Sequence, residues 1–173
     1  VAAIRPDLDP VDSVGALTPD RQHGAVVDAV LRTDRQRDHV ARAAAGGGTD
    51  PDGSPLYPGH SRGMPRAEIE ARRARGEPYV MRLDMTRAMA AASDRLAGAA
   101  LSFIEIDENG ASQRITCDPG RWGDVVIQRK EVPTSYHLSV VVDDALQGIT
   151  HVTRGRDLFN ATDIHRLLQV LLD

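Results

Sequence analysis

The stretch from Pro133 to Asp157 constrains the fold more than any other part of the chain, because its apolar residues follow a helical period between clear start and stop signals. Apolar side chains recur at the spacing of one helix face: Leu138, Val141, Val142, Ala145 and Leu146. The three consecutive valines favour a strand instead. Thr134 and Ser135 can cap a helix start, however, and Gly148 is a typical helix stop. We therefore predict a helix.

A short strand is expected after this helix, over Ile149 to Val152. Arg154 then lies just past the end of that strand, where open α/β sheets place their ligand contacts. Tyr136 stands at the other end of the same stretch, so the helix, the turn and the strand can return both side chains to one place.

Apolar periodicity and turn residues predict alternating helices and strands in the rest of the chain. Residues 19–45 contain a helix, and a loop rich in Gly, Pro, Asp and Ser spans 46–63. Further helices are predicted over 65–75 and 85–100, and strands over 79–83, 101–106, 113–117 and 125–129, with a turn at 107–110. A last helix follows Thr162 as its cap, with an apolar face of Ile164, Leu167, Leu168, Leu171 and Leu172, and with His165 and Arg166 on or beside the polar side.

Composition limits the kinds of protein this can be. The chain has 173 residues, 41% of them hydrophobic, which suffices for one domain with a core. A net charge of −4 provides no global attraction for nucleic acid. The single Cys117 excludes an internal disulfide framework and a thiolate metal cage, and we interpret it as a small core residue. No signal peptide or membrane span is evident, so we expect a cytoplasmic protein. We also expect a monomer.

The segment PTSYHLSVVVDDALQGITHVTRGRDL resembles the core of class I glutamyl-tRNA synthetases. The residues VPTSYHL, which precede the VVVDD run of this segment, are more similar to the short bacterial subfamily, the glutamyl-queuosine tRNA(Asp) synthetases. The match runs from Tyr79 to Asp173, is partial over Tyr57 to Arg62 and is poor before that. The resemblance implies an α/β, Rossmann-like catalytic-domain fragment. Its parts would be a diverged N-terminal part (1–45), an inserted α+β segment (46–116) and a core with the amino-acid site (117–173).

The resemblance also implies a glutamate site. It implies that Arg154 binds the side-chain carboxylate of glutamate, which a guanidinium can bind with two parallel hydrogen bonds. It also implies that the hydroxyl of Tyr136 orients the same ligand. A surface arginine and a half-buried tyrosine are the alternative. Asp7 and Asp9 match a family stretch that binds the amino acid, although Pro6 replaces the family's glutamate there. A solvated loop of Asp and Pro is an equally supported interpretation of IRPDLDP.

The family's reaction uses ATP with Mg²⁺ to form glutamyl-adenylate and then transfers the glutamyl group to tRNA, in the short subfamily to queuosine of tRNA(Asp). Neither the HIGH-like nor the KMSKS-like signature occurs in the sequence, so we expect this chain alone not to bind ATP properly. Val1 and Asp173 look like partial-gene boundaries, with a processed start as the alternative. Two alternative interpretations of the function remain: a fragment of an ordinary glutamyl-tRNA synthetase, and a non-catalytic glutamate- or RNA-binding remnant.

Two further sites follow from partial resemblances. LYPGHSR resembles the family's zinc-region motif Y-P-G-T-C-R, but Ser61 replaces the cysteine next to the retained Tyr57, and neither His39 nor His60 supplies the missing ligands. We predict that zinc is lost. A basic cluster of Arg62, Arg66, Arg72, Arg73 and Arg75 could contact RNA phosphate, or could be a solvated helix face balanced by glutamates. The candidate contacts are Arg62, Arg66, Arg72 and Arg73.

Overall fold

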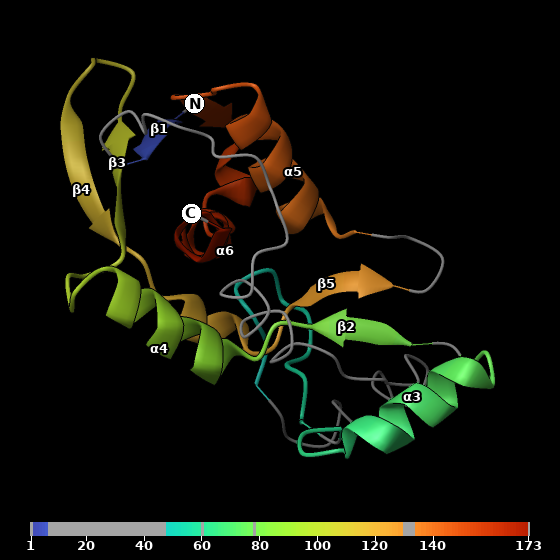
Figure 1. Cartoon of the computed structure of the whole chain (residues 1–173). Coiled ribbons are helices and arrows are strands. Elements are labelled where there is room, and N and C mark those ends of the chain that lie inside the picture. Colours follow the sequence, from blue (N-terminus) through green and yellow to red (C-terminus); the bar gives the residue numbers. More distant parts are fainter. Residues whose placement is uncertain (1, 7–47, 60, 78, 130–133, 173) are drawn as a thin grey trace.

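The computed structural model describes residues 2–6, 48–59, 61–77, 79–129 and 134–172, with only the backbone of 2–6 and of Arg129 (Figure 1). The predicted helix within 19–45 and the candidate residues Asp7, Asp9, His39 and His60 lie outside the described residues. In chain order the elements are β1 (Ala2–Pro6), α3 (Arg66–Ala74), β2 (Val80–Arg82), α4 (Met85–Arg95), β3 (Ser102–Ile106), β4 (Ser112–Thr116), η1 (Pro119–Trp122), β5 (Val126–Arg129), α5 (Tyr136–Leu146), β6 (Val152–Arg154), η2 (Arg156–Leu158) and α6 (Thr162–Leu172). The chain therefore has the mixed helix and strand content that the sequence predicted.

A four-stranded sheet in the order β4-β3-β1-β6 forms one end of the molecule, and β2 and β5 form a separate pair (Figure 1). Each pairing among the described strands is antiparallel. The interpretation of IRPDLDP as a solvated loop is wrong for Ile4 to Pro6, which belong to β1. Pairing on both sides outweighs the local preference of proline, and Pro6, which has no N–H, lies beyond the part of β1 that β6 reaches.

The helix predicted in the central stretch is confirmed as α5. The Ser135 side chain caps it by accepting a hydrogen bond from the N–H of Leu138 at 3.4 Å. At the other end Gly148 adopts a φ of 65°, and the N–H of Ile149 bonds to the carbonyl of Asp144 at 2.9 Å. Because this turn holds Ile149 against the end of α5, the extended segment starts later than predicted. The strand is Val152–Arg154 rather than 149–152, and Arg154 is its last residue.

The hairpin of β3 and β4 is also confirmed. Asp107 organises its turn by accepting hydrogen bonds from the N–H groups of Asn109 at 2.9 Å and Ala111 at 2.8 Å. Cys117 follows β4, is 8% exposed and packs in a small cluster with Phe103, as expected of a core residue. Its backbone N–H continues the pairing of the hairpin by bonding to Leu101.

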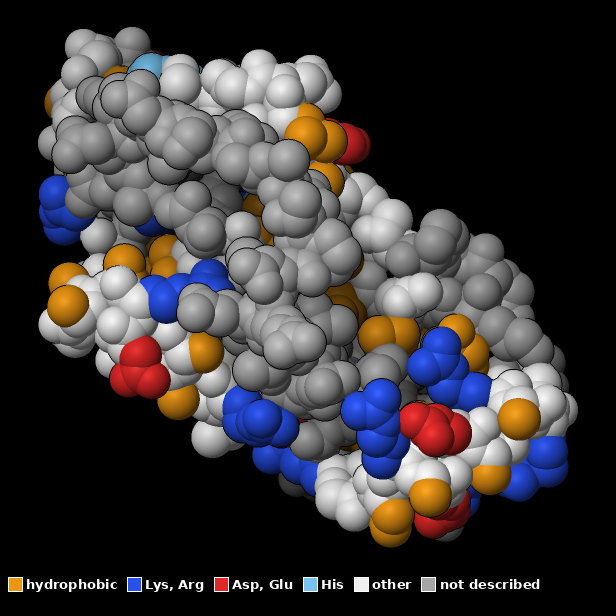
Figure 2. Space-filling model, viewed as in Figure 1, with side chains coloured by type: hydrophobic (Ala, Val, Ile, Leu, Met, Phe, Trp, Pro, Cys, Tyr) orange, Lys and Arg blue, Asp and Glu red, His pale blue; other side chains and the backbone are white. Residues whose placement is uncertain are grey.

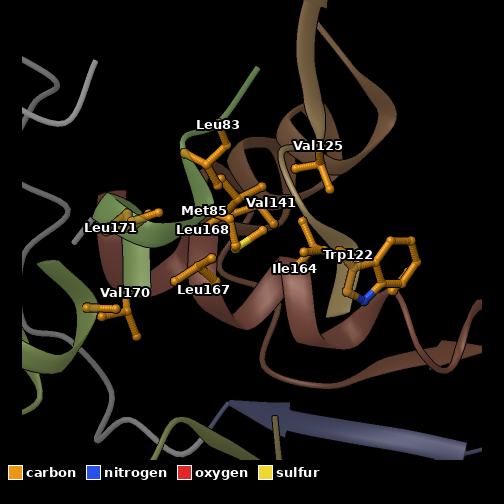
Figure 3. Close-up of a cluster of buried hydrophobic side chains, with 13 residues drawn as sticks. Leu83, Met85, Trp122, Val125, Val141, Ile164, Leu167, Leu168, Val170 and Leu171 are labelled. Atoms are coloured by element: carbon orange, nitrogen blue, oxygen red, sulfur yellow. The ribbon is translucent and has the colours of Figure 1, made fainter. Parts of the chain in front are cut away.

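The main core lies where α4, α5 and η1 pack around α6, and β5 packs on α5 (Figure 3). Ile164 and Leu167 of α6 are completely buried, and Trp122 of η1 is 4% exposed. The predicted apolar face of α6 therefore does pack in the core. No helix in the described part of the chain is both long and apolar enough to cross a membrane.

The prediction that His165 and Arg166 lie on or beside a polar side of this helix is wrong, because each is only 3% exposed. Packing on several sides leaves α6 without a solvent face, so its polar residues need partners inside the protein. Arg166 donates from Nε to the carbonyl of Ser102 at 2.9 Å. Thr162 is the first residue of α6 rather than its cap, since the N–H of His165 already bonds to the carbonyl of Ala161 at 3.1 Å.

Candidate amino-acid site

Tyr136 and Arg154 meet at His165. Nη1 of Arg154 lies 2.8 Å from Nδ1 of His165 and donates also to the Thr162 hydroxyl at 3.4 Å. The Tyr136 ring stands edge-on to the His165 ring, with centroids 5.8 Å apart. The two residues that the sequence singled out thus share one neighbour, although they come from different elements.

Three elements build the cluster. Tyr136 is the first residue of α5, Arg154 ends β6, and His165 lies in the first turn of α6. The position of Arg154 is fixed by pairing with β1, where its partner is Ala2. Because α5 and α6 pack together in the core, the start of α5 is brought over the first turn of α6.

His137 extends the cluster below Tyr136. Its Nδ1 lies 3.1 Å from Nε2 of His165, and its ring stands edge-on to Trp122 at 6.0 Å. Burial is the first cause that lowers the pKa of both histidines, and it lowers that of His165 to about 3, with the charge of Arg154 and the neighbouring His137 adding to the effect. Both rings are therefore neutral at pH 7.

Arg154 has donors without acceptors. Its buried Nε has no hydrogen-bond partner among the described residues, and neither has the buried Nε1 of Trp122. Within the same residues no carboxylate forms an ion pair with Arg154. Burial lowers the pKa of Arg154, while Tyr136 and Asp144 raise it through their charges. Since burying an unpaired cation is costly, the arrangement favours an added anion.

The basic cluster is already engaged in pairs. Arg62 donates from Nε and Nη2 to Asp124, whose side chain is completely buried. On α3, Arg66 pairs with Glu70 and Arg72 with Glu68, so blue and red side chains alternate over this end of the surface (Figure 2). The guanidinium of Arg73 lies over the Tyr79 ring at 5.1 Å. These contacts agree with the alternative of a solvated helix face, and RNA contact stays a prediction.

The zinc-region loop is closed by hydrogen bonds. The N–H of Ser61 donates to the Tyr57 hydroxyl at 2.8 Å, and the guanidinium of Arg82 lies over the Tyr57 ring at 4.6 Å. In the described part of the chain no group of three or more His, Cys, Asp or Glu residues is placed to hold a metal ion. Because His60 is outside that part, the expected loss of zinc stays a prediction.

His137, His165 and Trp122 also belong to the cluster, although the sequence did not predict them as site residues. Their only sequence signal was position: two of them lie beside Tyr136 and in the first turn of the final helix. The amphipathic pattern of that helix pointed His165 outward, and only the packing of α5 on α6 turns it into the cluster.

Comparison with known proteins gives a consistent family. Residues 41–173 match the family model for class I tRNA synthetases (E and Q), catalytic domain. A glutamyl-Q tRNA(Asp) synthetase of Rhodobacter capsulatus is 72% identical over 50 residues, covering 29% of this chain and 18% of the relative. One from Symbiobacterium thermophilum is 37% identical over 129 residues, covering 75% of this chain and 35% of the relative. A glutamate–tRNA ligase of Thermus thermophilus is 34% identical over 113 residues, covering 65% of this chain and 21% of the relative.

The chain thus spans about a third or less of the length of these relatives. The family model nevertheless covers well over half of the chain and includes the whole of the cluster around Arg154. The chain therefore belongs to the class I tRNA synthetases (E and Q), catalytic domain family.

Proposed function

We propose that the chain provides the glutamate site for ATP-dependent activation of glutamate and its transfer to tRNA, with queuosine of tRNA(Asp) as the acceptor. The observation that carries this proposal is the buried Nε of Arg154, a cationic donor without a partner among the described residues. A carboxylate is the anion best suited to such a donor, because a guanidinium binds it through two parallel hydrogen bonds.

Arg62 illustrates the contact we propose. Its Nε and Nη2 bind the two oxygens of Asp124 at 3.0 and 2.5 Å. Arg154 presents the same edge, since its Nη1 is occupied by Thr162 and His165 while Nε is not bonded within the described residues. We assign that edge to the side-chain carboxylate of glutamate. The Tyr136 side chain, 55% exposed beside it, supplies a hydroxyl for a second polar contact.

We propose ATP and Mg²⁺ as co-substrates because the chain belongs to the class I tRNA synthetases, which use both. Neither the HIGH-like nor the KMSKS-like signature occurs in the sequence, and no described residue is assigned to ATP or Mg²⁺. We therefore derive no step of adenylate formation from this chain. The Rossmann-like architecture of the catalytic domain is likewise proposed from family membership. The strand pairs among the described residues are antiparallel and so do not themselves indicate a parallel sheet.

The names of the relatives support the acceptor. The relatives from Rhodobacter capsulatus and Symbiobacterium thermophilum are glutamyl-Q tRNA(Asp) synthetases, and the first has the high local identity of 72%. The second candidate is transfer to the tRNA 3′ end, which the likeness to the Thermus thermophilus glutamate–tRNA ligase supports. Contact of Arg66, Arg72 and Arg73 with tRNA phosphate belongs to either candidate and would require exchange of their present partners.

Glutamate-dependent ATP–pyrophosphate exchange tests the activity, performed with the complete gene product that contains this segment. We expect exchange with glutamate, and more than tenfold less with aspartate or glutamine. Substitution Arg154→Lys should remove most of it, whereas Arg75→Lys, on an exposed pair with Glu77, should leave it unchanged. Absence of exchange with glutamate and with related amino acids would refute the enzyme and favour a non-catalytic remnant.

A further inference from the structure

We propose that His165 is a positioning residue that holds Arg154 in the orientation that receives the substrate carboxylate, and that His137 supports His165 by accepting a hydrogen bond from its Nε2. The inference rests on the proposed function, because it takes glutamate as the ligand of Arg154. It assigns a specificity role to a buried histidine pair beyond the two residues that the sequence identified.

The direction of each hydrogen bond follows from one fixed donor. A guanidinium only donates, so Nδ1 of His165 must be unprotonated to accept from Nη1 of Arg154 at 2.8 Å. Neutral His165 then carries its proton on Nε2, which faces Nδ1 of His137 at 3.1 Å. His137 must accept there and carry its own proton on Nε2. The two hydrogen bonds therefore run in one direction, from Arg154 to His165 and from His165 to His137.

Packing makes His165 a rigid support. It is 3% exposed, and its ring is flanked by the ring of His137 at 5.2 Å and that of Tyr136 at 5.8 Å. A ring held in this way cannot rotate without losing both contacts. Because Nη1 is tied to it, the guanidinium of Arg154 keeps its Nε edge directed away from α6.

A neutral support also leaves the charge of Arg154 available. A carboxylate in the place of His165 would pair with the guanidinium and compete with the substrate. Asp144 acts on Arg154 only through its charge, without an ion pair among the described contacts. The lowered pKa of His165 agrees with this role, since the ring stays neutral at pH 7. The cluster can therefore orient the cation without neutralising it.

Three substitutions test the inference by glutamate titration of the chain in a calorimeter. His165→Leu removes the acceptor and should weaken glutamate binding by about tenfold or more. His165→Gln restores an acceptor and a donor, and should return the affinity to within about threefold of the wild type. His151→Leu, at an exposed histidine beside Thr150, is the matched control and should change nothing. A purely structural role predicts no rescue by glutamine.

A second measurement does not depend on glutamate. Nitrogen-15 spectra of the histidine rings in the wild-type chain should show His165 neutral, with the proton on Nε2, at pH 7. A proton on Nδ1 would overturn the inference whatever the variants do, including a leucine variant that fails to fold. Wild-type affinity in His165→Leu, together with lost affinity in Arg154→Lys, overturns the inference and leaves the proposed function standing. A chain that binds no glutamate overturns the proposed function and the substrate role of His165, while the ring spectra still decide whether His165 holds Arg154.

Discussion

Arg62 and Asp124 lie far apart in the sequence and are joined by two hydrogen bonds, from Nε to Oδ2 at 3.0 Å and from Nη2 to Oδ1 at 2.5 Å. Asp124 is 1% exposed and also accepts from the N–H of Met85 at 3.1 Å. One carboxylate therefore ties the zinc-region loop to the start of α4. In a loop that lacks the family's cysteines, this pair and the stacking of Arg82 on Tyr57 are described contacts that fasten the loop to the rest of the protein.

Substitution Asp124→Ala should lower the free energy of unfolding by about 2–4 kcal/mol, because it leaves the buried N–H of Met85 without its acceptor and removes the ion-pair partner of Arg62. Urea unfolding followed by circular dichroism measures the loss. Glu77→Gln, at an exposed pair with Arg75, should change the same quantity by less than about 0.5 kcal/mol. Equal effects of the two substitutions would show that Asp124 is not a fastening point.

Stability should rise with pH between about pH 5 and 7. The pKa of His165 is lowered to about 3 and that of His137 is lowered too, so near pH 5–6 the unfolded chain binds protons that the folded chain excludes. A histidine whose pKa is lower in the folded state stabilises the fold fully at pH values above its unfolded-state pKa of about 6.5. This stabilisation is lost as the pH falls, by up to about 1.4 kcal/mol per pH unit for each ring.

Urea unfolding at several pH values tests this dependence. The titratable groups that face the two rings among the described residues are Arg154, Tyr136 and the opposite histidine, and the charges of Asp50 and Asp52 raise the pKa of His137 in part. His165→Gln should flatten the curve, and His151→Leu should not. A wild-type curve that is already flat from pH 5 to 7 would contradict the buried neutral pair.

Cys117 should resist thiol reagents in the folded chain. Burial raises its pKa to about 12, so almost no thiolate forms at pH 8, and the side chain is 8% exposed. Reaction with an aromatic disulfide reagent should be slow in buffer and fast in urea. Rapid labelling of the native chain would place Cys117 outside the core.

Tyr136→Phe separates the ring from the hydroxyl at the site. The phenyl ring keeps the edge-on contact with His165, whereas the polar contact to the ligand is lost. Glutamate affinity should fall about threefold to tenfold, which corresponds to the loss of about 1 kcal/mol of binding free energy for one hydrogen bond. Stability should stay within about 0.5 kcal/mol, because the side chain is 55% exposed. A large loss of stability would instead indicate a structural role for the hydroxyl.

The sequence predicted the elements whose signals are local. The caps of α5 and the Asp107 turn of the hairpin are set by residues a few positions apart, and both were identified correctly. β1 was missed because its pairing partners, β3 and β6, lie far along the chain. The start of β6 was misplaced because Gly148 and Ile149 still belong to the turn after α5.

The same distinction applies to the candidate site. Arg154 and Tyr136 were found through a contiguous motif, and the structure brings both to His165. His165 itself was assigned to a polar face, since periodicity assumes that a helix has one solvent side. α6 has none, because α4, α5 and β3 all pack on it. A buried polar residue on such a helix is therefore visible only in the assembled fold.

The affinity of the chain for glutamate, measured by calorimetry before and after Arg154→Lys, tests the central claim most directly. Lysine keeps the positive charge but cannot present the two-donor edge that Arg62 uses on Asp124. We predict measurable binding by the wild type and at least about thirtyfold weaker binding by the variant, equivalent to about 2 kcal/mol. Equal glutamate affinity in both proteins would contradict the assignment of the carboxylate to Arg154.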